Sequence, residues 1–344
     1  MNLMRESIFV GAFRSFCTAF AAILGIALSI GLVLFGIGII AGPNYFPPKA
    51  EPLIAADANG DRDLLPGSSP ALLRIDIHGV IGMGDLTSDK LEEILLDSRD
   101  DFLANNRVKG ILLHFDTPGG VATDADAIYR MLMDYKAKYK VPIFAYVDGM
   151  CASGGMYVAS AADKIYATDS SVIGSVGVLL GPNFNFSDLM TKWGIASKTF
   201  TEGKDKDMLN PFRPWVPGED QSIQNAIAAM YQRFVAVVSQ ARPLLTKEKL
   251  IQDYGAHIYI SEEAAKLGYI DVPNTDYSHA VADLATAAGV HEKYQVVALQ
   301  IPRPLFAPFA ESMFSSKEIK HKLDLGPTYL PELGGKFLYL YLPH

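Results

Sequence analysis

A serine among small residues is the first candidate for chemistry in this sequence. Residues 148–157 read DGMCASGGMY, which places Ser153 directly before Gly154 and Gly155. We expect a helix to begin here, so that the N–H of Gly154 lacks a partner within the helix and the helix dipole favours negative charge. A hydroxyl beside such a donor suits nucleophilic attack, with the oxyanion bound by backbone amides. The alternative is an N-cap serine with a structural role.

No histidine motif supplies the base that a serine nucleophile needs. The α/β-hydrolase signature G-x-S-x-G is not met, because Cys151 occupies the first glycine position. His114 lies on a predicted buried strand and is interpreted as a core residue. A lysine can remove the serine proton if burial lowers its pKa from about 10.4 to about 7–8. A site that uses a lysine in this way must therefore exclude water.

Two lysines lie in a polar segment further along the chain. Residues 201–212 read TEGKDKDMLNPF and contain Lys204 and Lys206. In an extended run these two side chains would point the same way, so their spacing alone does not choose between them. The alternative for either lysine is a solvated surface charge.

A second glycine-containing turn precedes the serine. Residues 114–120 read HFDTPGG, after a predicted strand and before a predicted helix. Gly119 and Gly120 would let backbone N–H groups face a bound group, although a tight turn without a ligand is the alternative. No GxGxxG or Walker motif is present here, so the segment does not indicate nucleotide binding.

The histidines and cysteines indicate no metal site and no disulfide framework. The two cysteines, Cys17 and Cys151, lie in unlike segments, and neither a CxxC nor an HExxH motif occurs. The seven histidines are scattered: His78, His114, His257, His279, His291, His321 and His344. We expect a fold that rests on its hydrophobic core and a site without a metal.

Strand and helix patterns alternate around the candidate residues. Predicted strands cover residues 71–77, 108–115 and 143–147, and predicted helices cover 90–103, 124–139, 219–241, 247–254, 262–267 and 278–288. This alternation predicts an α/β fold with a mostly parallel sheet covered by helices. Functional loops should then follow the carboxyl ends of the strands, where both glycine-containing turns lie.

Composition limits the class of protein. The 344 residues are 49% hydrophobic, which excludes a chain that is disordered throughout, and the length suits one large domain with appendages or two domains. Lys and Arg number 30 against 38 Asp and Glu, which gives a net charge of −8. Nucleic-acid binding is disfavoured, because it needs a basic surface.

An uncharged apolar segment near the N-terminus predicts a membrane anchor. Residues 16–42 exceed the roughly 20 residues that cross a bilayer and are longer than the apolar region of a signal peptide. Arg5 and Arg14 precede this segment and Lys49 follows it, which places the N-terminus in the cytoplasm and the rest outside. Residues 43–70 are rich in proline and are interpreted as a tether.

Taken together, these segments resemble the signal peptide peptidase A (protease IV) family of membrane-anchored serine peptidases. That family shares its fold with Clp-type peptidases and the crotonases. Six motifs occur in the family's order between residues 71 and 272: D-T-P-G-G at 116–120, A-S-G-G at 152–155, A-D-K-I at 162–165, I-G-S-V-G-V at 173–178, G-x-x-K-x-x-x-x-P-F at 203–212 and A-A-K-L-G-Y-I-D at 264–271. The resemblance implies a Clp/crotonase-like fold of repeated ββα units with a mostly parallel sheet, preceded by one transmembrane helix.

The resemblance also implies a role for each candidate residue. Ser153 matches the family's nucleophile, and Lys206 matches its general base, three residues after a glycine and five before a proline; Lys204 misses this spacing. Ser175, in I-G-S-V-G-V, matches a serine that orients the lysine.

For the oxyanion, the resemblance implies the backbone N–H of Gly154 and that of a glycine in the first turn. Gly120 is preferred and Gly119 is the alternative. No metal or organic cofactor is implied.

The implied protein is a homo-oligomeric ring, an octamer, in which one site can draw its serine and lysine from neighbouring subunits. Its substrates are remnant signal peptides and other apolar peptides. The implied protein is a single-pass protein of the inner (plasma) membrane, with its catalytic domain on the extracytoplasmic side. The expected parts are a cytoplasmic N-terminus (1–15), an anchor (16–42), a tether (43–70), a peptidase domain (71–289) and an extension of unknown role (290–344). A crotonase-type acyl-CoA enzyme and an inactive membrane scaffold are the competing hypotheses.

Overall fold

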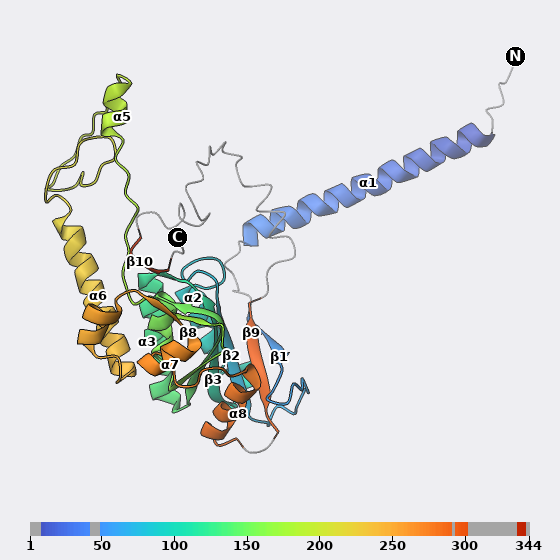
Figure 1. The fold of residues 1–344 in the computed structure, drawn as a ribbon. Helices are drawn as coiled ribbons and strands as arrows, with labels where there is room; N and C mark the ends of the chain where they lie inside the picture. Colours follow the sequence, from blue (N-terminus) through green and yellow to red (C-terminus); the bar gives the residue numbers. More distant parts are fainter. Residues whose placement is uncertain (1–7, 42–48, 291–292, 302–335, 342–344) are drawn as a thin grey trace, which may run out of the picture. The chain divides into compact units, whose positions relative to one another are not determined.

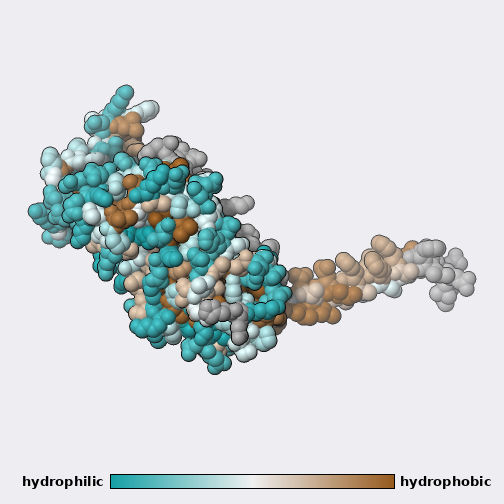
Figure 2. Space-filling view, turned by 60° about the horizontal axis from the view of Figure 1, so that its bottom comes forward, coloured by the Kyte–Doolittle hydropathy of each residue, from teal (hydrophilic) through white to brown (hydrophobic). Residues whose placement is uncertain are grey.

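The structure is a computed structural model that describes residues 8–41, 49–290, 293–301 and 336–341 (Figure 1). The chain divides into two units after Lys49. The first unit contains one long helix, α1 (Ile8–Ala41). Residues 10–36 of this helix are apolar and unburied, as Figure 2 shows, and are long and apolar enough to cross a membrane.

The second unit is built on a mixed, mostly parallel sheet. Its strand order is β1-β9-β2-β3-β5-β7-β8, with β6 paired to β5. Only the β1–β9 and β7–β8 pairs are antiparallel. The strands span Glu51–Ala55 (β1), Ala71–His78 (β2), Val108–Thr117 (β3), Ile143–Ala152 (β5), Lys164–Ala167 (β6), Val172–Gly174 (β7), Ile258–Ile260 (β8) and Gln295–Gln300 (β9).

Helices cover both faces of this sheet. The described helices of this unit span Ser88–Asp97 (α2), Ala122–Tyr139 (α3), Gly154–Ala159 (α4), Ser187–Lys192 (α5), Gln221–Ala241 (α6), Ser261–Leu267 (α7) and Tyr277–Ala287 (α8), with shorter helical turns η1 (Asp101–Leu103) and η2 (Lys249–Tyr254). Of these, α5 lies away from the sheet (Figure 1). The predicted helices and strands are therefore found, with shifted ends.

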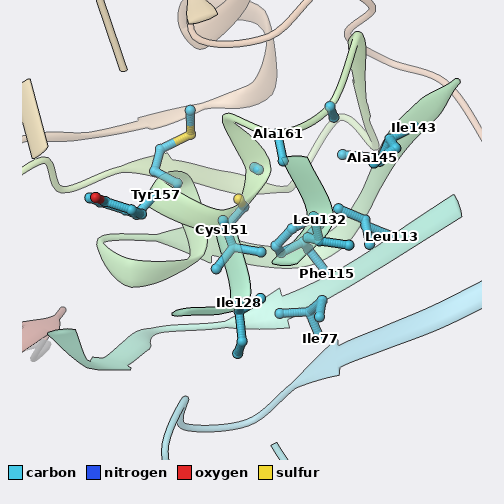
Figure 3. Close-up of a cluster of buried hydrophobic side chains, with 14 of the residues drawn as sticks. Ile77, Leu113, Phe115, Ile128, Leu132, Ile143, Ala145, Cys151, Tyr157 and Ala161 are labelled. Atoms are coloured by element: carbon cyan, nitrogen blue, oxygen red, sulfur yellow. The ribbon is translucent and has the colours of Figure 1, made fainter. Parts of the chain in front are cut away.

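Alternation along the strands explains the two layers. On β2, Leu73, Ile75 and Ile77 join the core beneath α2, α3, α4 and α6, whereas Leu72 joins the core beneath α8. Figure 3 shows the larger core, in which Ile128 and Leu132 of α3 lie among strand side chains. Both faces of the sheet are buried, as expected for parallel strands.

The sheet extends beyond the segment expected to form the domain. Glu51–Ala55, within the expected tether, forms edge strand β1, and Gln295–Gln300, within the expected extension, forms β9. The two strands pair with each other, and β9 also pairs with β2. The tether interpretation is corrected for residues 51–55, because a neighbouring strand from the far end of the chain satisfies their backbone groups.

Candidate active site

Ser153 lies at the junction between β5 and α4 in a strained backbone conformation. Its φ and ψ are 52° and −114°, and its side chain makes no capping hydrogen bond. An N-cap residue ordinarily has extended backbone and caps with its oxygen, so the N-cap alternative does not describe this serine. The residue is 1% exposed, and its N–H donates to Gly174 O at 2.8 Å. Strain of this kind is typical of functional positions.

The second half of β5 is redirected before it reaches the serine. Phe115 pairs with Val147, but the next pair is Thr117 with Cys151, so β5 holds extra residues in a bulge. The Asp116 carboxylate accepts the Met150 N–H at 3.1 Å and fixes this bulge. Before the bulge β5 pairs with β6, and after it β5 pairs with β7.

The glycine turn after β3 lies against the first turn of α4. Gly119 and Gly120 begin the short strand β4 (Gly119–Val121). A Cβ on Gly119 would lie 2.6 Å from Gly154 N, and a Cβ on Gly154 would lie 3.3 Å from Gly120 N. Gly119 also has φ +95°, so both approach and conformation require glycine there.

Hydrogen bonds distinguish the two glycine amides. The N–H of Gly119 donates to Thr117 Oγ1 at 3.1 Å and is therefore engaged within the turn. The N–H of Gly120 instead faces the opposite side of β4, where a strand from the C-terminal end of the chain lies.

The strand β10 (Leu338–Leu340) runs antiparallel to β4, with Tyr339 opposite Gly120. The flanking bonds are Ala122 N–H to Phe337 O at 3.0 Å and Tyr341 N–H to Pro118 O at 2.8 Å. Because hydrogen-bonded pairs alternate in an antiparallel ladder, Gly120 and Tyr339 form such a pair, and the Gly120 N–H points at the Tyr339 carbonyl.

The Tyr339 carbonyl also lies close to Gly154 and Gly119. A Cβ on Gly154 would lie 3.0 Å from this oxygen, and a Cβ on Gly119 would lie 2.0 Å from it. On its other edge, β10 exchanges two backbone hydrogen bonds of 2.9 Å between Leu338 and Leu179. An extended peptide thus lies between two backbone segments, which is β-strand addition. Residues 338–340 belong to the segment 290–344, for which the sequence indicated no role.

The side chain of Tyr339 fills an aromatic pocket. Its ring stacks on Tyr157 at 5.2 Å and lies 4.6 Å from Phe234 between centroids. Its hydroxyl donates to Met230 O at 3.1 Å, and burial raises its pKa to about 12. Tyr157 in turn donates to Asp126 at 2.6 Å. Sequence patterns did not reveal this pocket, because its residues come from α3, α4 and α6.

Ser175 lies next to the serine in space. It follows Gly174, whose carbonyl accepts the Ser153 N–H, and it is 5% exposed. Ser175 also has a positive φ, 57°, and its N–H donates to His257 O at 2.7 Å. The structure therefore brings together Ser153, Ser175, Gly154 and Gly120.

Lys206 is not brought to this group. It lies in an arm, residues 180–218, that runs away from the sheet and carries α5 (Figure 1). Lys206 and Lys204 are both exposed, and among the described residues no hydrogen bond or ion pair of the Lys206 ammonium group is found. Within one subunit the lysine has no contact with Ser153.

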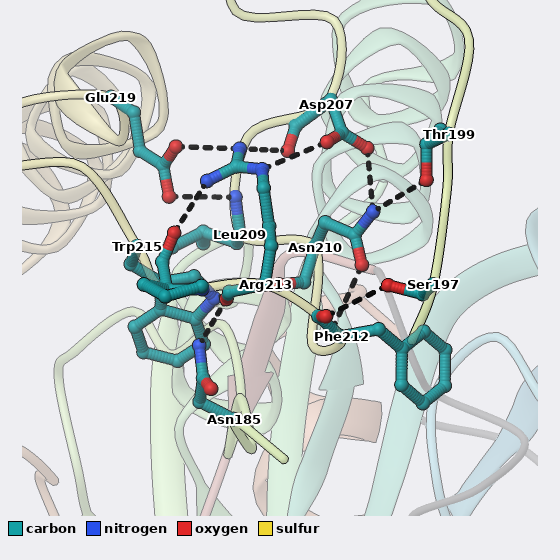
Figure 4. A network of polar contacts seen from close by, with 11 residues as sticks. Asn185, Ser197, Thr199, Asp207, Leu209, Asn210, Phe212, Arg213, Trp215 and Glu219 are labelled. Carbon is teal, nitrogen blue, oxygen red and sulfur yellow. Dashed lines mark hydrogen bonds and ion pairs between the residues drawn. The ribbon is translucent and has the colours of Figure 1, made fainter. Parts of the chain in front are cut away.

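The arm segment beside Lys206 is nevertheless ordered by polar contacts. Arg213 bridges Asp207 at 2.8 Å and Glu219 at 2.7 Å, and Asn210 donates to Asp207 at 2.8 Å (Figure 4). Asp207 is the next residue after Lys206, so this network holds the lysine backbone in place.

The arm also exposes many large apolar side chains: Phe184, Phe186, Leu189, Trp193, Ile195, Phe200, Phe212, Trp215 and Val216. A concentration of this kind is typical of a protein-protein contact.

His114 lies apart from the serine, on the sheet face covered by α8. It is 7% exposed, as expected for a core histidine. It forms a group with Asp76 and His78 whose potential metal-ligating atoms lie within 4.8 Å of one another. The Arg74 guanidinium lies 2.8 Å from His114 Nδ1 and 2.7 Å from Asp76 Oδ1, so it already supplies a positive charge to these two groups.

The Asp76 contacts predict an acid-sensitive contribution to stability. Burial alone would raise the Asp76 pKa, but hydrogen bonds to His114 and Arg74 outweigh it and lower the pKa to about 2. A lowered carboxyl pKa stabilises the fold above about pH 4, and this contribution is lost as the pH falls towards 2. The difference in Tm between the protein and Asp76→Asn should therefore shrink between pH 5 and pH 2. A constant difference would contradict the ionic role.

Comparisons with known proteins agree with this geometry. Residues 135–291 match the family described as "Peptidase family S49", and residues 93–173 match "Clp protease". A provisionally named protease of Synechocystis is 33% identical over 235 residues, covering 68% of this chain and 80% of the relative. A provisionally named signal peptide peptidase SppA of Enterococcus faecium is 30% identical over 210 residues, 59% of this chain and 60% of the relative.

Other similarities are weaker. Protease 4 of Salmonella typhi is 28% identical over 205 residues, covering 60% of this chain and 31% of the relative. The chain spans only 60% and 56% of the first two curated relatives it matches. A solved structure, a ClpP1 mutant of Listeria monocytogenes, has a TM-score of 0.39 and 14% identity, covering 60% of this chain and 94% of that one.

The mixed sheet and its flanking helices define a Clp-protease-like α/β fold, which confirms the predicted fold class. The family within this fold is identified by the Synechocystis relative, which is 33% identical to this chain and is matched along 80% of its own length. This chain belongs to peptidase family S49, the family of SppA and protease 4.

Proposed function

We propose that the chain is a membrane-anchored serine endopeptidase in which Ser153 is the nucleophile. The observation that carries this proposal is the position of β10: an extended peptide lies against Gly120, with its Tyr339 carbonyl close to Gly154, the residue after the serine. A substrate strand bound in the same way would present its carbonyl to the Ser153 hydroxyl.

The N–H groups of Gly120 and Gly154 are the proposed oxyanion donors. Gly119 is the weaker candidate, because Thr117 already accepts its N–H. Two fixed backbone donors in a buried site stabilise a developing oxyanion without reorganisation.

Lys206 of a neighbouring subunit is the proposed general base. In its neutral form it takes the Ser153 proton while Oγ bonds to the peptide carbonyl carbon and the carbonyl electrons move to the oxygen. The protonated lysine then gives this proton to the leaving amine as the C–N bond breaks. Water attacks the acyl-enzyme by the same route and releases the second product. Ser175 orients the lysine.

Assembly into a ring, an octamer, is part of the proposal. Two observations support a contact between copies: Lys206 lies exposed on the arm, and the arm presents unburied aromatic side chains, including Trp193 and Phe200. Burying that surface against a second copy removes it from water and can bring the lysine to a neighbouring serine.

The proposed substrates are apolar peptides, including remnant signal peptides. The aromatic pocket that holds Tyr339 supports an apolar preference, and the length of the apolar region of α1 supports anchoring. We place the N-terminus in the cytoplasm and the second unit on the outer side of the inner membrane.

Covalent labelling tests this function. The full-length protein in detergent is treated with a serine-directed acylating or phosphonylating inhibitor, and the modified residue is located by peptide mass spectrometry. Labelling of Ser153, absent from Ser153→Ala and prevented by a competing peptide, is the expected result. Labelling elsewhere, or none in a protein that assembles, would refute the peptidase assignment.

Ser175→Ala is expected to slow peptide hydrolysis about tenfold without abolishing it, the size of one lost hydrogen bond of about 1.4 kcal/mol. The reason is that the lysine would remain close but less well oriented. The measurement is kcat on a chromogenic apolar peptide, with circular dichroism to verify folding. An unchanged kcat would remove Ser175 from the mechanism.

A further inference from the structure

Thr117 lies where the two proposed oxyanion loops meet. It is the last residue of β3, it is fully buried, and it pairs with Cys151, two residues before Ser153. Its two side-chain branches face different parts of the site.

The hydroxyl of Thr117 holds the glycine turn. Oγ1 accepts the N–H of Gly119 at 3.1 Å and donates to Gly79 O at 2.5 Å, so both hydrogen-bonding functions of the hydroxyl are used. Gly79 follows β2, and its own N–H donates to Asp116 O at 2.9 Å. The turn is therefore tied to the ends of two adjacent strands.

The methyl group of Thr117 contacts the other loop. A Cβ on Gly155 would lie 2.7 Å from Thr117 Cγ2, so the threonine packs closely against the first turn of α4. Gly155 follows Gly154, which offers the second proposed donor. One side chain thus contacts both loops.

The direction of the Gly120 N–H depends on the preceding peptide unit. The peptide unit that carries the Gly120 N–H is held on one side by the Gly119 carbonyl, which accepts the Ile81 N–H at 2.8 Å. Thr117 Oγ1 and the φ of +95° at Gly119 fix the preceding unit, and the Gly120 N–H then faces the groove, where it meets the Tyr339 carbonyl. Without the hydroxyl, the buried Gly119 N–H loses its hydrogen-bond acceptor. A rotated orientation of this peptide unit, in which the N–H finds a different acceptor, then becomes comparable in free energy to the native one.

We propose that Thr117 is a positioning residue that aligns the Gly120 amide with the amide of Gly154 for oxyanion stabilisation. The inference rests on the proposed peptidase function and adds a residue that contacts no substrate. Its effect belongs to the transition state, because a misdirected donor weakens binding of the oxyanion more than binding of the peptide.

Three variants of the full-length protein test this role. Thr117→Val keeps the shape but removes the hydroxyl, and Thr117→Ser keeps the hydroxyl but removes the methyl. Thr168→Val is the matched control, because the Thr168 hydroxyl contacts Ser171 instead of the glycine turn. Each protein is assayed for kcat and KM on an apolar peptide, and for inhibition by a peptide aldehyde that forms a tetrahedral adduct.

We expect Thr117→Val to lower kcat about 10- to 100-fold with KM nearly unchanged, and to weaken aldehyde inhibition by a similar factor. Thr117→Ser should restore most of the activity, and Thr168→Val should match the unmodified protein. Equal kcat in Thr117→Val, or a rise in KM alone, would overturn the inference. If Thr117→Val unfolds, Thr117→Ser decides: a large loss of kcat there, in a folded protein, also overturns it. An inactive unmodified protein would instead refute the peptidase function.

Discussion

Ser153→Ala and Lys206→Ala are each expected to lower kcat for an apolar peptide by at least about 10³-fold, whereas Lys204→Ala keeps most of the activity. Removing Ser153 deletes the attacking oxygen, and removing Lys206 deletes the group that accepts its proton. Lys204 is the matched control, because both lysines are exposed on the same arm segment. Steady-state kinetics on proteins of equal oligomeric size provides the measurement. Turnover retained in Lys206→Ala would remove the lysine from the mechanism.

The same two variants test whether the base comes from a neighbouring subunit. Lys206 makes no contact with Ser153 within one chain, so a mixed assembly should contain some sites with both groups intact. Unfolding and reassembling the two inactive variants together at equal amounts should restore about a quarter of the activity. A mixture that assembles to full size but stays inactive would show that the lysine does not act between copies.

Removal of residues 336–344 is expected to raise kcat/KM for added peptides about tenfold. β10 lies in the groove where a substrate strand is proposed to bind, and a tethered segment competes at an effective concentration of order 1 mM. If the free strand binds with a Kd of about 0.1 mM, an added peptide meets an open groove in only about one site in ten. Initial rates at low peptide concentration measure the effect.

Tyr339→Ala provides the matched point variant for this experiment. It keeps the chain length and removes the ring that stacks on Tyr157 and contacts Phe234. It should raise kcat/KM in the same direction as the truncation and by a smaller factor. If both variants retain the helix content of the full chain and neither raises kcat/KM, β10 does not compete with substrate.

The longer elements that lead to Ser153 could be predicted because their patterns are strong. The buried strands β3 and β5 are continuous apolar runs, and α3 and α6 show helical periodicity over many residues. The strands β1, β9 and β10 were not predicted. β1 and β10 are short, with five and three residues. All three strands also depend on partners that are distant in sequence: β1 and β9 pair with each other, with Ala55 opposite Val296, and β10 pairs with β4, with Tyr339 opposite Gly120.

The candidate site divides in the same way. Ser153, Gly154 and Gly120 follow strands whose order in the sheet could be inferred, so their proximity was predictable. The surroundings of Lys206 were not, because its arm packs against nothing that the sequence pattern specifies. Likewise, the choice of Gly120 over Gly119 depends on one threonine hydroxyl, whose direction no spacing rule gives.

The bulge in β5 separates two tasks within one strand. The residues before Asp148 belong to the hydrophobic core and pair with β6, whereas those after Met150 pair with β7 and lead to Ser153. A one-residue insertion or deletion in the bulge would swing the hydroxyl to a new direction and leave the upstream register untouched. The length of this bulge therefore sets the direction of the nucleophile independently of the strand that forms the core.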